Sequence, residues 1–296
     1  MEKSFFTHYL LLSLLIFSCD SLPPDVQSAL NKASKKRPAL ETVIAHYNQP
    51  KDSLKRQAAY FLIANMDDHY FYAGELTEAY DEIIRNSERV NIPVLLTALD
   101  SLKGRYSQSL RYKQDVEVIS AQYLIENINL AFEAWQRPWA KHLTFEQLCE
   151  YVLPYKRGQE KPESWRADLV KQYSWVGDSV SDQSDLKEVC TLINKDLQSW
   201  FTIILGFDYP ADIPYSVYFK VKSARDCADA AKMTLYPMRA MGVPVAYDFT
   251  PHWANRSLGH AWNVVLYKNG KAVNFMGSEA HPGMHKLEFV GFGRMK

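Results

Sequence analysis

Three residues near the end of the sequence have the types and the order that covalent catalysis by a thiol requires. Cys227 stands where a loop gives way to a predicted helix, and His260 opens a predicted strand. Asn274 lies on the strand that returns from a turn at residues 269–270. That turn is an Asn-Gly pair, which suits a two-residue hairpin because both positions take a positive φ. A thiol, an imidazole that removes its proton and a polar group that holds the imidazole form a nucleophilic site.

The predicted position of Cys227 at a helix start favours its reactivity. Unpaired backbone N–H groups and the helix dipole stabilise a thiolate there. The thiolate would attack an amide or ester carbonyl, the imidazolium would protonate the leaving group, and the acyl group would pass to water or to an amine. Backbone N–H groups at the same helix start could hold the oxyanion. The sequence leaves the choice between water and an amine open.

Three motifs in this stretch resemble those of the transglutaminase-like superfamily. They are Arg225-Asp226-Cys227-Ala228-Asp229, Arg239-Ala240-Met241-Gly242-Val243-Pro244 and Gly259-His260-Ala261-Trp262-Asn263. The resemblance implies a papain-like cysteine protease fold with Cys227 as the nucleophile and His260 as the base. In bacterial relatives, hydrolysis of peptide-like bonds is the commoner activity.

The third position departs from the family's usual pattern. Most members carry an aspartate there, several residues after a tryptophan. The corresponding segment here, residues 271–277, has no tryptophan and offers Asn274, which would hold His260 as an amide does in papain-like enzymes. Asp248 is the alternative, although it lies on the strand before His260 and a structural or loop-capping role suits it as well.

Three residues are candidates for contact with a substrate. Tyr218 lies in an aromatic, proline-containing segment that leads into Cys227 and could form one wall of a cleft; a place in the core is the alternative. His252 lies in a predicted loop over the site and is a rival to His260 as the base. Trp262 follows His260 by two residues, and we expect it to pack beside the imidazole and shield it from water.

The N-terminus resembles the export signal of a bacterial lipoprotein. Lys3 supplies a positive charge, and residues 10–17 form an apolar run that is too short to span a membrane comfortably. Cleavage before Cys19 would leave a lipid-modified cysteine at the mature N-terminus. We therefore predict a signal peptide at 1–18, a tether at 19–24, and a lipid-anchored location in the cell envelope, facing the periplasm or the cell surface. An ordinary signal peptide with a chance cysteine is the alternative.

Composition narrows the partners and cofactors. The chain has 296 residues and a formal net charge of zero, which argues against nucleic acid, since proteins that bind it are normally basic. Cys149 and Cys190 lie on apolar helical faces, so we expect both to be buried thiols; a disulfide between them is the alternative. The N-terminal half has no glycine-rich phosphate loop and no metal-ligand spacing, and we expect neither a cofactor nor a metal.

The periodicity predicts an α+β protein in two parts. Residues 25–140 indicate a helical domain, and the resemblance implies a transglutaminase-like domain at 141–296, with an antiparallel sheet packed on the cysteine-bearing helix. Three further stretches resemble one exported bacterial subgroup of these proteins, at residues 58–66, 150–156 and 162–166. Helices are predicted near residues 24–30, 38–44, 54–65, 74–85, 92–103, 116–136, 143–153 and 186–205.

These features together predict an exported enzyme that transfers acyl groups through a thiol and hydrolyses peptide or amide bonds. Its partner would be a peptide or protein substrate, with cell-wall or glycan-linked substrates included. The alternative is a surface protein that uses the same fold to bind peptides or glycans without turnover, and the unusual third position favours it. Calcium-dependent cross-linking would need a cluster of acidic ligands, and the sequence shows none near the site.

Overall fold

The protein is a mixed α+β structure, as the sequence predicts. The computed structural model describes residues 21–86, 110–204, 209–253 and 258–284, with a few positions between 94 and 102. The predicted signal peptide and Cys19 lie outside these residues, and the helix predicted near 92–103 lies largely outside them. Among the described residues, no helix has the length and apolar character that a membrane crossing requires.

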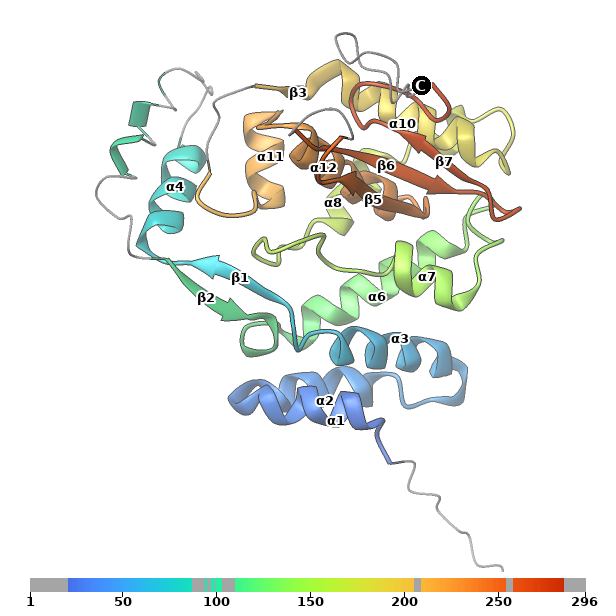
Figure 1. Ribbon diagram of the computed structural model, residues 1–296. Helices are drawn as coiled ribbons and strands as arrows, with labels where there is room; N and C mark the ends of the chain where they lie inside the picture. Colours follow the sequence, from blue (N-terminus) through green and yellow to red (C-terminus); the bar gives the residue numbers. More distant parts are fainter. Residues whose placement is uncertain are drawn as a thin grey trace, which may run out of the picture.

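Helices account for most of the regular structure (Figure 1). The α-helices are α1 (Pro24–Lys32), α2 (Arg37–His46), α3 (Ser53–Ala64), α4 (Glu75–Asn86), α6 (Ala121–Trp135), α7 (Phe145–Tyr151), α8 (Arg166–Gln172), α9 (Val176–Ser179), α10 (Leu186–Trp200), α11 (Tyr215–Val221) and α12 (Cys227–Ala240). The 3-10 helices are η1 (Ser34–Lys36), η2 (Pro50–Asp52) and η3 (Asp115–Glu117). The strands are β1 (Tyr70–Ala73), β2 (Arg111–Gln114), β3 (Thr202–Ile203), β4 (Ser223–Ala224), β5 (Val245–Thr250), β6 (His260–Leu266) and β7 (Ala272–Phe275).

Local sequence signals start several of these helices. α1 carries a proline in its first turn, where the missing N–H would have no partner in any case. Thr144 and Gln147, spaced three residues apart in the sequence, form a reciprocal capping box at the start of α7. Ser120 caps α6 by accepting a hydrogen bond from the backbone N–H of Tyr123 at 3.2 Å. These caps fix where the chain enters each helix.

The hairpin-like pair of β1 and β2 is a feature that the helical pattern of residues 25–140 did not predict. The two strands are antiparallel, with Tyr70 opposite Gln114 and Ala73 opposite Arg111. Each strand has only four residues, and α4 and further chain lie between them. A strand that pairs with such a distant segment gives little local signal in the sequence. The tyrosines of β1 could therefore equally well be read as residues that pack between helices.

A three-stranded antiparallel sheet carries the C-terminal part of the chain. Its strand order is β5-β6-β7, and it lies against α12, with α8 below (Figure 1). Burial alternates along β6, so that Ala261, Asn263 and Val265 are buried on the α12 side and the residues between them are more exposed. A turn does join β6 to β7, but only Gly270 of the Asn-Gly pair has a positive φ, of +76°, and the N–H of Gly270 donates to the carbonyl of Tyr267, so the predicted two-residue turn is replaced by a longer one.

Two hydrophobic cores form, and they do not divide the chain at residue 140. One contains α1, α2, α3 and α6, and Cys149, Leu153 and Tyr155 from later in the chain join it. The other contains the sheet and α8 to α12, and Leu76 and Tyr80 of α4 join it. The predicted domains at 25–140 and 141–296 therefore exchange elements across their boundary.

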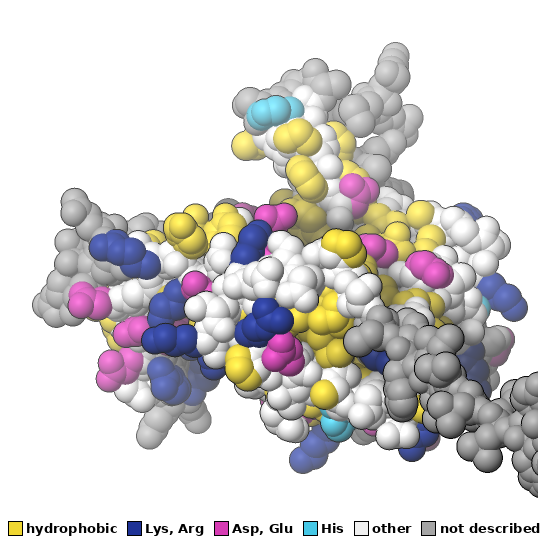
Figure 2. Space-filling view, turned by 90° about the horizontal axis from the view of Figure 1, so that it is seen from below, with side chains coloured by type: hydrophobic (Ala, Val, Ile, Leu, Met, Phe, Trp, Pro, Cys, Tyr) yellow, Lys and Arg dark blue, Asp and Glu magenta, His cyan; other side chains and the backbone are white. Residues whose placement is uncertain are grey.

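Charged side chains show no segregation by sign on the face seen from below. Lysine and arginine side chains are interspersed there with aspartate and glutamate (Figure 2). This mixture agrees with the formal net charge of zero for the whole chain.

One buried amide fastens the sheet to α12. The Nδ2 of Asn263 donates to the carbonyl of Ala231 in α12 at 2.8 Å, and its Oδ1 accepts from the N–H of Gly277 at 3.2 Å. Asn263 is completely buried. Gly277 approaches the helix so closely that an added Cβ would lie 1.7 Å from Oγ1 of Thr234. Only a glycine fits at this crossing, because any side chain would push the segment after β7 away from α12.

We predict that Gly277→Ala lowers the free energy of unfolding by roughly 1–3 kcal/mol, the usual effect of overpacking a core. Gly177→Ala is the matched control, because a Cβ at Gly177 meets no atom within 4 Å and the residue lies in α9. Urea denaturation followed by circular dichroism measures both. Equal stability of the two variants would contradict the close approach of Gly277 to Thr234.

Candidate active site

Cys227 is the first residue of α12, as the sequence predicts. Asp226 caps the helix by accepting a hydrogen bond from the backbone N–H of Asp229 at 2.9 Å. Arg225 clasps the carboxylate of Asp229 with two nitrogens, at 2.5 and 3.1 Å. The Arg-Asp-Cys-Ala-Asp motif is therefore a local clamp, which fixes the chain on both sides of the cysteine.

The thiol of Cys227 lies against the backbone of β6. The N–H of Ala261, the residue after His260, donates a hydrogen bond to the sulfur. The N–H groups of a strand inside a sheet point alternately to its two neighbours. Since the N–H of Leu266 donates to the carbonyl of Pro244, on the β5 side, the N–H groups of the odd-numbered residues of β6 point toward β7. β7 ends at Phe275, which pairs with Asn263. The sulfur of Cys227 thus accepts the hydrogen bond of Ala261 N–H, which a longer β7 would otherwise accept.

Two tryptophan rings lie near the imidazole of His260. The ring of Trp253 stacks on the imidazole, with 6.2 Å between the ring centroids. The ring of Trp262, which follows His260 by two residues in β6, has its centroid 5.9 Å from that of the imidazole. Gly259 brings the β5–β6 connection close, because an added Cβ would lie 2.4 Å from the carbonyl oxygen of Thr250. The glycine of the Gly-His-Ala-Trp-Asn motif therefore lets this connection fold back beside the histidine.

The strand register separates Asn274 from His260. Asn274 pairs with Val264, four residues along β6 from His260, which corresponds to about 13 Å along the strand. The same register, continued, would place Met276 opposite Trp262, but Met276 leaves the strand and bridges to Ala280. The structure does not bring the Asn274 amide to the imidazole, so the predicted orienting role has no geometric basis here.

Asp248 lies nearer to His260 than Asn274 does. It pairs with Trp262 across the β5–β6 ladder, and Thr250 pairs with His260 itself. In an antiparallel sheet, paired residues share a face, so Asp248 is the diagonal neighbour of His260 on one face of the sheet. Its Oδ1 accepts a hydrogen bond from the N–H of Phe249 at 2.9 Å. The alternative considered from the sequence is thus the better placed of the two.

The structure corrects one of the three predicted substrate contacts. Tyr218 is completely buried, and its ring packs against the guanidinium of Arg157 at 4.8 Å. It belongs to the core because it lies on the inward side of α11, and it forms no wall of a cleft. His252 is exposed in the β5–β6 connection, and Trp262 is half-buried on the same face of the sheet as His260.

Burial opposes ionisation at both groups. It raises the pKa of the Cys227 thiol, and the hydrogen bonds from the N–H groups of Ala261 and Ala228 only partly offset this. It also lowers the pKa of the His260 imidazole. The sequence predicts a thiolate favoured by the helix start, whereas in the structure desolvation outweighs the helix N–H groups. The resting site therefore holds a neutral thiol and a neutral imidazole, which can accept a proton.

Cys149 and Cys190 are free and buried, as predicted, and they belong to different cores. Burial raises the pKa of Cys149 to about 12 and the pKa of Cys190 above its usual range. Cys227 is the one of the three that is partly exposed. Among the described residues, no group of three or more His, Cys, Asp and Glu side chains is arranged to hold a metal ion.

Sequence reasoning missed Trp253 and Tyr247. Trp253 follows His252 directly in the predicted loop. Nothing in the sequence indicates which of these two rings lies against His260. Tyr247 pairs with Asn263 on the α12 side of the sheet, where burial and, to a smaller extent, Cys227 raise the pKa of its hydroxyl. Its position follows from the register of β5, which the sequence alone does not determine.

Comparison with known proteins adds no relative to this picture. The chain matches no protein-family model, no curated protein and no solved structure. The site is therefore interpreted from its own geometry and from the motifs quoted above.

We predict that alkylation of Cys227 by iodoacetamide has an apparent pKa above the ordinary thiol value of about 8.5. The folded-state pKa is raised, so the thiol contributes stability below about pH 8.5 that is lost as the pH rises further. Mass spectrometry of the labelled peptide over a pH series measures the reaction, with Cys190 as the unreactive internal control. A midpoint below that of a free thiol would contradict the dominance of burial.

Proposed function

We propose that the protein is a thiol-dependent acyl-transfer enzyme of the transglutaminase-like class, which hydrolyses peptide or amide bonds. Cys227 is the nucleophile and His260 is the base. The observation that carries the proposal is the hydrogen bond from the N–H of Ala261 to the Cys227 sulfur, because it puts the thiol beside the residue that follows His260. This contact brings the start of α12 beside the start of β6, where His260 stands 33 positions after Cys227 in the sequence.

The chemistry follows from the neutral resting pair. As the sulfur attacks the substrate carbonyl, His260 takes the thiol proton, so that a tetrahedral intermediate with an oxyanion forms. Backbone N–H groups of the first turn of α12 point at this region and can hold the oxyanion. The imidazolium then gives its proton to the leaving amine, and a thioester remains. Water, deprotonated by His260, attacks the thioester and releases the acid and the free thiol.

The structural roles of the motif residues support the resemblance to this class. Asp226 caps the nucleophile helix, Gly259 allows the chain to fold beside the histidine, and Asn263 fastens the histidine strand to that helix. Each of these residues belongs to one of the quoted motifs, and each acts on the relative position of Cys227 and His260. The antiparallel sheet packed on α12 also agrees with the papain-like arrangement that the resemblance implies.

A peptide- or glycan-binding surface protein without turnover is the second candidate. The separation of Asn274 from His260 and the raised pKa of Cys227 favour it. Under both candidates we propose an exported protein anchored through Cys19 in the cell envelope, with a peptide or protein partner that includes cell-wall or glycan-linked material. The apolar run at 10–17 and the cysteine after it support this location.

We predict that the wild-type protein forms a thioester with p-nitrophenyl acetate and that Cys227→Ala does not. His260→Ala should slow acylation by about 100-fold or more, the usual contribution of a general base. Release of p-nitrophenol, with mass spectrometry of the acetylated peptide, measures the reaction. Acylation of Cys227→Ala at the wild-type rate would overturn the enzyme proposal, and the absence of any acylation of the wild type would favour the binding protein.

The third group can be identified with a second pair of variants. Asn274→Ala should acylate within about twofold of the wild type, because its amide lies far along the strand from the imidazole. Asp248→Asn should slow acylation by about tenfold and change the pH profile, if its carboxylate orients His260. Circular dichroism confirms that both variants fold. A large loss in Asn274→Ala with no loss in Asp248→Asn would contradict the assignment.

A further inference from the structure

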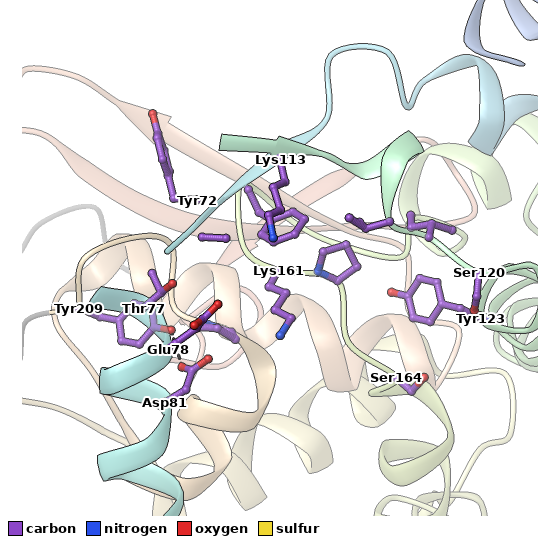
Figure 3. A pocket seen from close by; sticks show the side chains of 16 residues that line it. Tyr72, Thr77, Glu78, Asp81, Lys113, Ser120, Tyr123, Lys161, Ser164 and Tyr209 are labelled. Atoms are coloured by element: carbon purple, nitrogen blue, oxygen red, sulfur yellow. Dashed lines mark hydrogen bonds between the residues drawn. The ribbon is translucent and has the colours of Figure 1, made fainter. Parts of the chain in front are cut away.

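Two cavities adjoin each other along α4 and α11, away from Cys227. The first has a volume of about 420 Å³ and lies among β1, β2, α4 and the segments at 161–164 and 209–214 (Figure 3). The second has a volume of about 480 Å³ and lies between α4 and α11. Asp81 and Lys161 line both cavities. The two therefore adjoin each other at these residues, and we treat them together as the α4–α11 groove.

Buried apolar side chains form the floor of this groove. Phe71, Ile119 and Tyr209 line the first cavity, and each is less than 5% exposed. Val217 and Ile84 line the second and are also buried. Concave sites with an apolar floor and a few polar groups at the rim are typical of ligand-binding sites.

Four cationic side chains stand along the rim. Lys113 and Lys161 line the first cavity, and Figure 3 shows both reaching into its middle. Lys161 continues into the second cavity, where Arg85 and Lys220 join it. All four side chains are exposed, and within the described part of the chain none of them forms an ion pair.

The carboxylates of the groove are largely engaged by neutral donors. Asp81 accepts a hydrogen bond from the hydroxyl of Tyr209 at 2.6 Å. Glu163 accepts two from Ser216, from its N–H and from its hydroxyl, both at 2.8 Å. Glu78 is the further carboxylate that lines the first cavity. Four cationic side chains therefore stand beside three carboxylates, and because two of these carboxylates already accept hydrogen bonds, the cations are the groups left to bind an anionic ligand.

We propose that the α4–α11 groove binds an extended acidic peptide segment, with its carboxylates on the lysine and arginine side chains and its backbone over the apolar floor. An elongated groove with charges spaced along its rim suits an extended chain better than a single small ion. A neutral glycan would offer these four cations no carboxylate to bind. The groove would therefore select substrates of the proposed enzyme that carry acidic residues at a distance from the reacting bond, since it lies away from Cys227.

The groove has a direct connection to the nucleophile segment. The backbone carbonyl of Tyr209, a groove residue, accepts a hydrogen bond from Arg225 at 3.1 Å, and Arg225 clasps Asp229 beside Cys227. α11 itself leads through Lys222, at a φ of +58°, into β4 and then Cys227. This connection, and the choice of a substrate as occupant, rest on the proposed function, whereas binding to the groove does not.

The test is binding of an acetylated, amidated hexapeptide of alternating alanine and glutamate, measured by isothermal titration calorimetry with the Cys227→Ala protein. The inactive variant removes turnover, so that failure of the groove and failure of the enzyme proposal are distinguishable. We expect Lys161→Glu and Lys220→Glu each to weaken binding by about tenfold or more. Lys51→Glu is the matched control, because Lys51 is exposed in η2 and makes the same change in net charge outside the groove.

Two outcomes would overturn the proposal. One is equal binding of the same hexapeptide with glutamine in place of glutamate, since neutral side chains give the cations no partner. The other is an equal loss of affinity in Lys51→Glu and Lys161→Glu, since this would reflect the overall charge and not the groove. Preferential binding of a chitin oligosaccharide over the glutamate peptide would assign the groove to glycans and also overturn it.

Discussion

The relative position of the nucleophile helix and the histidine strand depends on the side-chain amide of Asn263. Its two ends bind α12 and the segment after β7, both in a site without water access, so neither group has another partner to turn to. A buried amide with both ends satisfied stabilises one register and disfavours every other, because each alternative leaves a donor or an acceptor unpaired. The fit of Gly277 against Thr234 adds a steric constraint to the same crossing.

Around this crossing, burial and reactivity oppose each other. The thiol lies close to the sheet, which holds it beside the histidine strand but raises its pKa. Burial also lowers the pKa of the His260 imidazole, which is therefore neutral and available as a base at neutral pH. A neutral base is what a protonated thiol requires. The site thus resembles a general-base system more than one with a preformed thiolate–imidazolium pair. The tryptophan rings beside His260 contribute to its burial.

The features that the sequence predicts well depend on local patterns. The capping box at Thr144, the turn before Gly270 and the helix start at Cys227 are each determined within about four residues. The role of Asn274 depended instead on counting residues across the hairpin, and its pairing with Val264, four positions along the strand from His260, removes it from the imidazole. The burial of Tyr218 depends on which side of α11 faces the core, and the pairing of β1 with β2 depends on a distant segment.

The sulfur of Cys227 also closes an edge of the sheet. The N–H of Ala261 points past the end of β7, where it would otherwise be an open donor at a strand edge. An alkylated sulfur is bulkier and carries a substituent between α12 and the strand, so the chemistry that inactivates the thiol also uncovers the strand. Alkylated preparations of the protein would then be prone to self-association through this edge, and the chemical state of one cysteine would govern solubility as well as reactivity.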